Sequence, residues 1–262
     1  MRGYKKIRDL RFQSVMDFKL AEIQNWQAVV NNEAKLCSAK TVKNSWGLVK
    51  SVLKENEMPI PNVRLPQMIE AEHEFLQPDQ IKDFLEIING EKYELVYLLA
   101  VHGLRSSEIL GLDVGKNLTE NEIRVRGAKV QTETESGAVQ YVQKDENKTI
   151  KSRRNVPVLI PRLEEMIKSE TSEELQKKIP DHPEAARKRL NRILKNNGLP
   201  EVGLHGLRHS FASLCYHLGL SEMQTMELGG WNDIFVMRKI YTHLAEKDRN
   251  DAKEKLKDFF AK

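Results

Sequence analysis

The spacing of apolar residues predicts helices near the start of the chain. From residue 15 to residue 56 they recur every three or four positions, as in Ile23, Trp26 and Val30, which is the period of one helix face. A second helix is expected to begin near Ser38, with an apolar stripe and flanking lysines. The stripe consists of Val42, Trp46, Val49, Val52 and Leu53, and the lysines are Lys40, Lys43, Lys50 and Lys54.

A proline-rich segment interrupts this helical pattern. Residues 58–68 read MPIPNVRLPQM, and proline continues neither a helix nor a central strand. We interpret the segment as a linker. Since a new folding unit begins near residue 74, the pattern predicts a helical domain at 1–68 and a larger domain at 74–262.

The larger domain is expected to be mainly α with a small antiparallel β-sheet, an α+β fold. Pro78 suits the first turn of a helix that Gly90 ends. Residues 121–160 contain alternating stretches separated by SG and DEN turn signals, which predict the sheet. From residue 161 onward the pattern is helical again, and SEMQ at 221–224 is a capping box that opens a helix.

Composition indicates a folded protein without a membrane partner. Of the 262 residues, 40% are hydrophobic and 31% are charged, unlike the composition of disordered chains. The longest apolar run, residues 95–101, is too short to cross a bilayer, and the N-terminus lacks the apolar core of a secretory signal, so we expect a cytosolic protein. Cys37 and Cys215 lack the paired spacing of a disulfide framework or a zinc site.

The charge of the chain is weakly informative. The net charge is +4 at pH 7, which fits a protein that binds a polyanion and equally fits a solvated basic surface. Residues 1–70 hold 12 lysines and arginines against 7 acidic residues, so the first domain carries the excess.

Four stretches place polar residues at the edges of otherwise apolar elements. They read HGLRSSEILGL with Arg105, NKTIKSRRNVPV with Lys148, HGLRH with His205 and Arg208, and LGGWNDIFVMRKIYTH with Trp231 and Tyr241. Each alone fits an ordinary structural explanation, such as an ion pair, a solvated turn, a helix cap or a packed tyrosine. In this order and at these separations they resemble the tyrosine recombinase family of phage and conjugative-element integrases. The resemblance covers residues 74–262 and, more loosely, the preceding helical domain.

Two features depart from the usual pattern of that family. Trp231 stands where the family often has histidine, and it precedes Tyr241 by ten residues, one more than the commonest interval. Other members have tryptophan there, where it donates through the indole nitrogen. Full-length integrases of this kind usually carry a further N-terminal arm-binding domain, so the chain is expected to be a fragment, truncated at its N-terminus, or a shorter relative.

The resemblance implies a site-specific DNA recombinase that works through a 3′-phosphotyrosine intermediate, without a metal ion, ATP or another cofactor. Tyr241 would be the nucleophile. Arg105 and Arg208 would neutralise the charge that builds on the phosphate oxygens, because a guanidinium presents a planar fork of donors and stays charged. At the start of a helix, unpaired backbone amides and the helix dipole favour an anion beside Arg208.

The remaining site residues are assigned by the same resemblance. His205 would contact the phosphate and accept the tyrosine proton, and Trp231 would donate a hydrogen bond. Lys148, expected on a β-hairpin in the minor groove, would protonate the departing 5′-oxygen. Glu108, one turn after Arg105, is interpreted as an orienting ion-pair partner.

The implied partners are double-stranded DNA attachment sites in the bacterial cytoplasm, at the nucleoid. The tail at 252–260 forms an apolar stripe that docks either on its own domain or on a neighbouring protomer, in which case a homo-oligomer, expected to be a tetramer, assembles on DNA. For the basic helix that follows residue 183, the alternative to DNA contact is an exposed helix face. The expected DNA contacts are Lys40, Lys43, Lys50, Lys151, Arg153, Arg154, Arg187 and Lys188.

Two other functions compete with this interpretation. A type IB topoisomerase uses the same constellation without a partner site, but the short helical domain and the integrase-like spacing argue against it. A DNA-binding regulator that has lost catalysis is the other. The intact set of Arg105, Lys148, His205, Arg208 and Tyr241 argues against a regulator.

Overall fold

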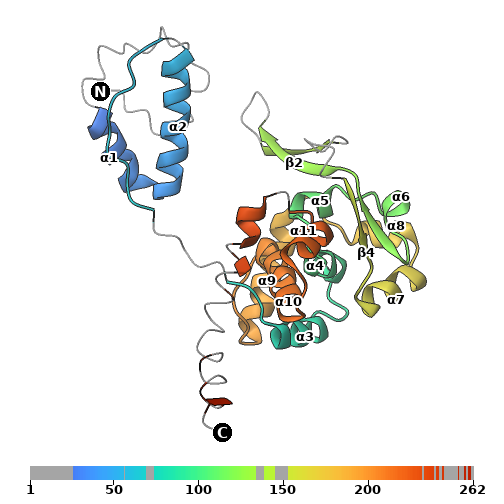
Figure 1. The fold of residues 1–262 in the computed structure, drawn as a ribbon. Helices are drawn as coiled ribbons and strands as arrows, with labels where there is room; N and C mark the ends of the chain where they lie inside the picture. The colour runs from blue at the N-terminus through green and yellow to red at the C-terminus, as the bar shows by residue number, and fades with distance from the viewer. Residues whose placement is uncertain are drawn as a thin grey trace. The chain divides into compact units, whose positions relative to one another are not determined.

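The chain divides into two compact units, residues 1–72 and 73–262, which we describe separately (Figure 1). The structure is a computed structural model, and the residues that it describes are 26–55, 57–68, 74–133, 139–144, 153–231, 233–238, 240–241 and 244, with the single positions 253, 257, 259 and 260.

The first unit contains a helical hairpin, α1 (Trp26–Leu36) and α2 (Ala39–Glu55). The hydroxyl of Ser38 accepts the backbone N–H of Thr41 at 3.3 Å, which confirms that the second helix starts near Ser38. Residues 15–25, the earlier part of the predicted helical stretch, lie outside the described residues. The core of the hairpin consists of Val30, Val42, Trp46, Val49 and Leu53.

The proline-rich segment packs on this hairpin. The side-chain amide of Gln27 donates to the carbonyl oxygen of Arg64 at 3.0 Å and accepts the backbone N–H of Arg64 at 2.7 Å. Met58, Val63 and Leu65 lie against the hairpin core. The segment therefore differs from the expected linker, because prolines exclude a helix but still allow an extended strand that buries apolar side chains.

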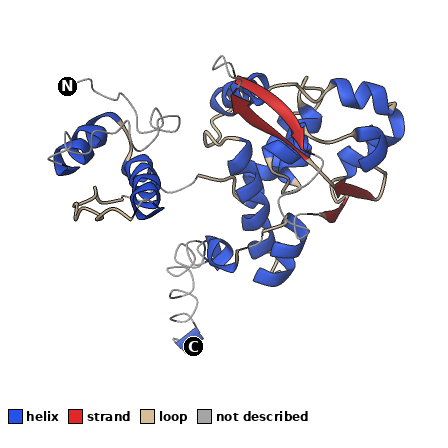
Figure 2. Ribbon diagram, turned by 90° about the horizontal axis from the view of Figure 1, so that it is seen from above, coloured by secondary structure: helices blue, strands red, loops and turns tan. Residues whose placement is uncertain are grey.

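The second unit is mainly helical, and Figure 2 shows strands as its smaller part. Pro78 opens the first helix, and Ser221 with Gln224 forms a capping box, so both predicted helix starts are confirmed. The elements that the structure describes are α3 (Pro78–Ile87), α4 (Glu94–Val101), α5 (Ser106–Leu110), α6 (Val114–Asn117), β1 (Glu122–Val125), β2 (Ala128–Glu133), β3 (Val139–Lys144), β4 (Arg154–Pro157), α7 (Pro161–Ser169), α8 (Ser172–Lys177), α9 (Pro183–Asn196), α10 (Leu204–His217) and α11 (Glu222–Gly229).

The predicted fold class, mainly α with a small antiparallel β part, is confirmed, and the described strands form two antiparallel pairs rather than a single sheet. β1 pairs with β4, and β2 pairs with β3. Arg126 separates β1 from β2 because its guanidinium donates to the carbonyl oxygens of Val125 and Arg154, each at 3.0 Å, and to the side chain of Asn155. These bonds close the end of the first pair, and the chain enters β2 in a new ladder.

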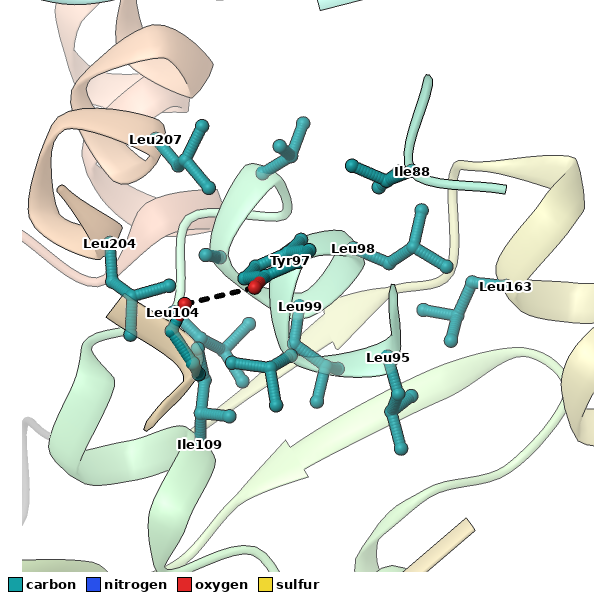
Figure 3. Packing of buried hydrophobic residues seen from close by; sticks show 14 of the residues in the cluster. Ile88, Leu95, Tyr97, Leu98, Leu99, Leu104, Ile109, Leu163, Leu204 and Leu207 are labelled. Carbon is teal, nitrogen blue, oxygen red and sulfur yellow. Dashed lines mark hydrogen bonds between the residues drawn. The ribbon is translucent and has the colours of Figure 1, made fainter. Parts of the chain in front are cut away.

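α4 and α10 form the centre of the second unit. All eight residues of α4 are buried, which explains the long apolar run, and α10 packs against both α4 and α3. Figure 3 shows Tyr97 of α4 among leucine side chains, with its hydroxyl donating to the carbonyl oxygen of Ala186 at 2.9 Å. Among the residues that the structure describes, every helix is too short or too polar to span a membrane.

His102 joins the end of α4 to the loop after β4. Its Nδ1 lies 2.7 Å from the carbonyl oxygen of Leu98, and its Nε2 accepts the backbone N–H groups of Leu159 and Ile160 at 3.1 and 3.3 Å. This pattern requires a neutral ring with the proton on Nδ1. Burial lowers the pKa of His102 from 6.5 to about 4.

Acidification should therefore destabilise the second unit. The unfolded chain takes up the His102 proton near pH 6.5, whereas the folded chain takes it up only near pH 4. The contribution to the free energy of unfolding is complete above pH 6.5 and is lost as the pH falls through this window. The loss is about 3 kcal/mol over the whole window, at roughly 1.4 kcal/mol per pKa unit.

Urea denaturation at pH 7.5 and pH 4.5 measures this loss. His102→Gln should be less stable than the wild type at pH 7.5 but should lose less stability on acidification. His182→Gln, at an exposed position, should keep the wild-type loss. Equal acid losses in the wild type and His102→Gln would show that this histidine is not the cause.

Candidate active site

Glu108 on α5 gathers three arginines that are far apart in the sequence. Its Oε1 accepts a hydrogen bond from Nη1 of Arg105 at 2.7 Å, and its two oxygens accept both amino groups of Arg154 at 3.0 Å. Nη1 of Arg208 lies 4.0 Å from Oε2. The interpretation of Glu108 as an ion-pair partner of Arg105 is confirmed.

The same carboxylate caps α5. The backbone N–H of Arg105, at the N-cap position, donates to Oε2 of Glu108 at 2.8 Å. Burial raises the pKa of Glu108, but the hydrogen bonds and charge of Arg154, followed by those of Arg105, lower it by more. Glu108 therefore stays ionised and holds the start of α5 and two guanidinium groups together.

Arg208 lies in the first turns of α10 with only 1% of its side chain exposed. Its Nη1 donates to the carbonyl oxygen of Gly103, and its Nη2 donates to that of Gly230 at 3.3 Å. Burial, followed by the charge of Arg105, lowers the pKa of Arg208 to about 9. The group thus remains a cation at neutral pH.

Trp231 packs on this guanidinium. The guanidinium carbon of Arg208 lies 4.0 Å from the centroid of the Trp231 ring, within the range of a cation–π interaction. The Trp231 ring is also nearly parallel to that of Phe211, with the centroids 6.4 Å apart. The structure therefore gives Trp231 a packing role, while its predicted role as a hydrogen-bond donor to phosphate stays a prediction.

Gly230 links the two predicted phosphate-binding arginines. Its carbonyl oxygen accepts a hydrogen bond from Nη2 of Arg105 at 2.8 Å and another from Nη2 of Arg208. Gly230 has a left-handed backbone, with a φ of 67°, and a Cβ atom placed there would lie 2.4 Å from Nε of Arg154. The side chain of Arg154 thus lies flat against the turn whose carbonyl orients the other two arginines.

His205 lies beside this cluster at the start of α10. Gly203 is the N-cap, so the HGLRH motif occupies the first turns of a helix, as the sequence predicts. His205 is exposed, whereas His209 is buried, and their rings meet edge to face with centroids 4.4 Å apart. The ring of His205 is therefore accessible to a substrate.

The hydroxyl of Tyr241 forms hydrogen bonds with Thr225 and Leu220, which lie outside the arginine cluster. Its hydroxyl oxygen is 2.6 Å from Oγ1 of Thr225 and donates to the carbonyl oxygen of Leu220 at 3.3 Å. Burial raises the pKa of Tyr241 more than the hydrogen bond with Thr225 lowers it. The ring packs on the small cluster that contains Phe211 and Trp231, and Trp231 is the residue whose ring packs on Arg208.

The predicted surface contacts differ in exposure. Arg154 is the clearest difference, because only 8% of its side chain is exposed and both its amino groups bind Glu108. Arg153 and Lys188 are exposed, and Arg187 is exposed in a pair with Glu184 at 2.9 Å. The burial of Arg154 follows from its place at the start of β4, where the strand passes under the Gly230 turn.

Other predicted residues are placed only in part. On α2, Lys40 and Lys50 are exposed and Lys43 is half-buried. Lys148 and Lys151 lie outside the described residues, and so does most of the tail at 252–260.

Sequence reasoning missed the parts played by Arg154, Gly230 and Thr225. Arg154 was grouped with its basic neighbours because its position under a turn 76 residues away leaves no local signal. Gly230 follows a helix in a GG pair, which is a recognisable sign of a left-handed turn. Thr225 offered no signal, since a threonine inside a helix is ordinary.

The comparisons with known proteins concern the family and the fold of the chain. Residues 74–248 match the family described as the phage integrase family. The chain is 26% identical to a tyrosine recombinase XerC-like protein of Caldanaerobacter subterraneus subsp. tengcongensis, over 99% of this chain and 76% of that protein. It is 25% identical to the integrase of Staphylococcus phage L54a, over 96% of this chain and 84% of that protein. Among solved structures, the Tn1549 transposon integrase in complex with transposon right end DNA has a similar fold, with a TM-score of 0.68 at 19% identity, covering 95% of this chain and 90% of that chain.

The contact between Gly230 and Arg154 can be tested with a matched pair of glycines. Gly198 has a φ of 66° and nothing within 4 Å of an added Cβ, whereas Gly230 has the same backbone and a crowded Cβ position. Gly198→Ala should lose about 1 kcal/mol from left-handed strain, and Gly230→Ala should lose about 3 kcal/mol because overpacking adds to the strain. Urea denaturation measures both, and equal losses would mean that the turn does not depend on Arg154.

Proposed function

The chain belongs to the phage integrase family, and we propose that it is a site-specific recombinase that cleaves and rejoins double-stranded DNA by transesterification. The convergence of Arg105 and Arg208 on the carbonyl oxygen of Gly230 carries the proposal. Two guanidinium groups held by fixed protein atoms form a preorganised receptor for a phosphate. The two guanidinium groups therefore do not have to reorient when negative charge builds on the phosphate oxygens.

In the proposed reaction the oxygen of Tyr241 bonds to the scissile phosphorus, and the bond from phosphorus to the 5′-oxygen breaks. The phenol proton passes to His205, and the 5′-oxygen receives a proton from Lys148. A 5′-hydroxyl from another strand then attacks the 3′-phosphotyrosine and releases the phenol. Each stage keeps the number of phosphoester bonds, so ATP is not required.

The arginines take the electrostatic part of this reaction. The pentacoordinate phosphorus carries extra negative charge on its non-bridging oxygens, and Arg105 and Arg208 neutralise that charge without a metal ion. Arg208 is suited to the task although burial lowers its pKa to about 9, because it is still protonated at neutral pH. An anion beside it strengthens that preference.

Tyr241 has to exchange its partners before it attacks. Its hydroxyl is bound to Thr225 and to the carbonyl oxygen of Leu220, and burial raises its pKa. Reaction requires the phenol to leave these groups and meet the phosphate at the arginines. The proposal therefore includes a shift of the segment that carries Tyr241.

DNA binding by both units completes the proposal. The lysines of α2 and the exposed Arg153, Arg187 and Lys188 are suited to phosphate contacts, which position a duplex without reading its sequence. In this arrangement the first unit is a core-type DNA-binding domain, and the second is the catalytic domain. We place the assembly at attachment sites on DNA in the bacterial cytoplasm, as a homo-oligomer, with the tail at 252–260 as the candidate link between protomers.

Tyr241→Phe should bind DNA normally but form no covalent adduct, because it lacks the attacking oxygen. The assay is incubation with a nicked suicide substrate that carries a candidate attachment core, followed by denaturing electrophoresis. Tyr93→Phe, a control in which another phenol is removed, should still form the adduct. An adduct that persists in Tyr241→Phe would assign the nucleophile to another residue.

The same assay tests the rest of the reaction. The wild-type adduct should form in excess EDTA, and cleavage that depends on added magnesium would contradict a metal-free mechanism.

Joining of strands from two duplexes distinguishes a recombinase from a topoisomerase, which reseals a single duplex.

Lys148→Ala should lose about 10²- to 10⁴-fold in cleavage rate, the usual contribution of a general acid. If the bridging 5′-oxygen is replaced by sulfur, the leaving group has a parent pKa near 8.5 and departs without a proton. The sulfur substrate should therefore restore most of the rate in Lys148→Ala but not in Arg105→Ala, which lacks phosphate neutralisation. Equal rescue of both variants, or of neither, would show that Lys148 is not the acid.

A further inference from the structure

Arg154 has the charge of a DNA contact but the surroundings of a structural residue. Both its amino groups bind Glu108 at 3.0 Å, and 8% of its side chain is exposed. Its own carbonyl oxygen accepts a hydrogen bond from Arg126 at 3.0 Å, and its backbone pairs with Val125 of β1. Both amino groups are therefore occupied by the charged oxygens of Glu108, whereas those of Arg208 are bound to neutral carbonyl oxygens, which a phosphate displaces more readily.

Two separate contacts connect Arg154 with the phosphate-binding arginines. Through Glu108 it fixes the carboxylate that binds the side chain and the backbone N–H of Arg105. Through Gly230 it supports the turn whose carbonyl oxygen binds both Arg105 and Arg208. Each of the two catalytic arginines therefore rests on at least one group that Arg154 holds in place.

Charge gives the second reason for an arginine here. Glu108 is buried, and burial alone would raise its pKa; the hydrogen bonds and charge of Arg154 are the largest influence that lowers it. Without Arg154, Arg105 would be the only one of the three arginines that donates a hydrogen bond to an ionised Glu108, with Arg208 4.0 Å away, and Glu108 would hold the guanidinium of Arg105 more firmly. Arg105 would then be less available to a phosphate.

We infer that Arg154 is a positioning residue of the recombination reaction, which neutralises Glu108 and supports the Gly230 turn so that Arg105 and Arg208 face the scissile phosphate. This inference rests on the proposed function for its catalytic consequence. A lysine cannot replace Arg154 fully, because it cannot bind both oxygens of Glu108 in a fork. The role differs from a DNA contact in that Arg154 acts without touching the substrate.

Arg154→Lys, which keeps the charge but not the fork, is the main test. The single-turnover cleavage rate with saturating DNA should fall about tenfold to a hundredfold, the effect of displacing reacting groups by a fraction of an ångström to one ångström. The slope of log Kd against log salt should not change in Glu108→Gln with Arg154→Met, which removes the charge of Arg154. A direct phosphate contact by Arg154, by contrast, would change that slope by about 0.9 when this charge is lost.

A double-mutant cycle with Glu108→Gln identifies the route of the effect. If Arg154 acts through Glu108, Arg154→Lys should cost less than about threefold in rate when Glu108 is already glutamine, because coupled residues are not additive. Arg189→Lys is the matched control. Arg189 forms a two-bond pair with Glu91 at 2.7 and 2.9 Å on the same domain, and its replacement should lower stability without slowing cleavage by saturated enzyme.

A titration of Glu108 separates this inference from the proposed function. The carboxyl carbon resonance of Glu108, followed by NMR against pH, should show a higher pKa in Arg154→Lys than in the wild type, whether or not any DNA is cleaved. If the wild type forms no adduct with attachment DNA, the proposed function fails, while this titration still reports on Arg154. An unchanged Glu108 titration, or a flatter salt slope with a full cleavage rate, would overturn the positioning role.

A second variant covers the case in which Arg154→Lys does not fold. Glu108→Gln with Arg154→Met removes both charges of this pair, an exchange that proteins often tolerate, and Arg208 keeps its hydrogen bonds to the carbonyl oxygens of Gly103 and Gly230. The double variant should fold and cleave as slowly as Glu108→Gln alone. Wild-type cleavage by the double variant would contradict the inference.

Discussion

One buried carboxylate, that of Glu108, is the anion on which the arginines of the site converge. Glu108 faces three guanidinium groups, so the cluster keeps an excess of positive charge in a place with little water. The effect of this excess charge is seen in the pKa of Arg208. Burial lowers that pKa most, the charge of Arg105 lowers it further, and the charge of Glu108 raises it. Backbone carbonyl oxygens of Gly103 and Gly230 accept hydrogen bonds from the two amino groups of Arg208 but add no negative charge. A bound phosphate would supply both acceptor oxygens and negative charge. An anion would therefore stabilise the positively charged cluster.

The sequence predicted those parts of the fold that depend on neighbouring residues. Pro78, the Ser221 capping box and the start of α10 follow from local chemistry, since each concerns backbone groups within one helical turn. The strand pairing could not be read in this way. The break between β1 and β2 includes Arg126, whose guanidinium donates to the carbonyl oxygen of Arg154, a contact between residues 28 apart that a local pattern does not reveal.

The site shows the same division between local and distant causes. The tetrapeptide HGLR occurs at 102–105 and again at 205–208, yet the two histidines do different work. His102 ends a buried helix and accepts two backbone amides, so it is fixed as a neutral ring, whereas His205 begins a helix and is exposed. The arginine of each motif nevertheless donates a hydrogen bond to the carbonyl oxygen of Gly230. Identical residues acquire separate roles because one copy follows a buried helix and the other opens one, and only the order of the elements distinguishes them.

The pKa of the Tyr241 phenol depends on where the side chain lies. Where it lies, burial raises the pKa of the phenol and the hydrogen bond with Thr225 compensates only in part, so the group keeps its proton and is a weak nucleophile. Beside Arg105 and Arg208 the nearby positive charge would favour the phenolate. In the proposed reaction, a single shift from Thr225 to the arginines would therefore bring the oxygen to the phosphate and make the phenol easier to deprotonate at the same time. Because the shared core around Phe211 touches both Trp231 and Tyr241, that shift needs a rearrangement of packing within one small cluster, while the arginines remain fixed by Glu108 and Gly230.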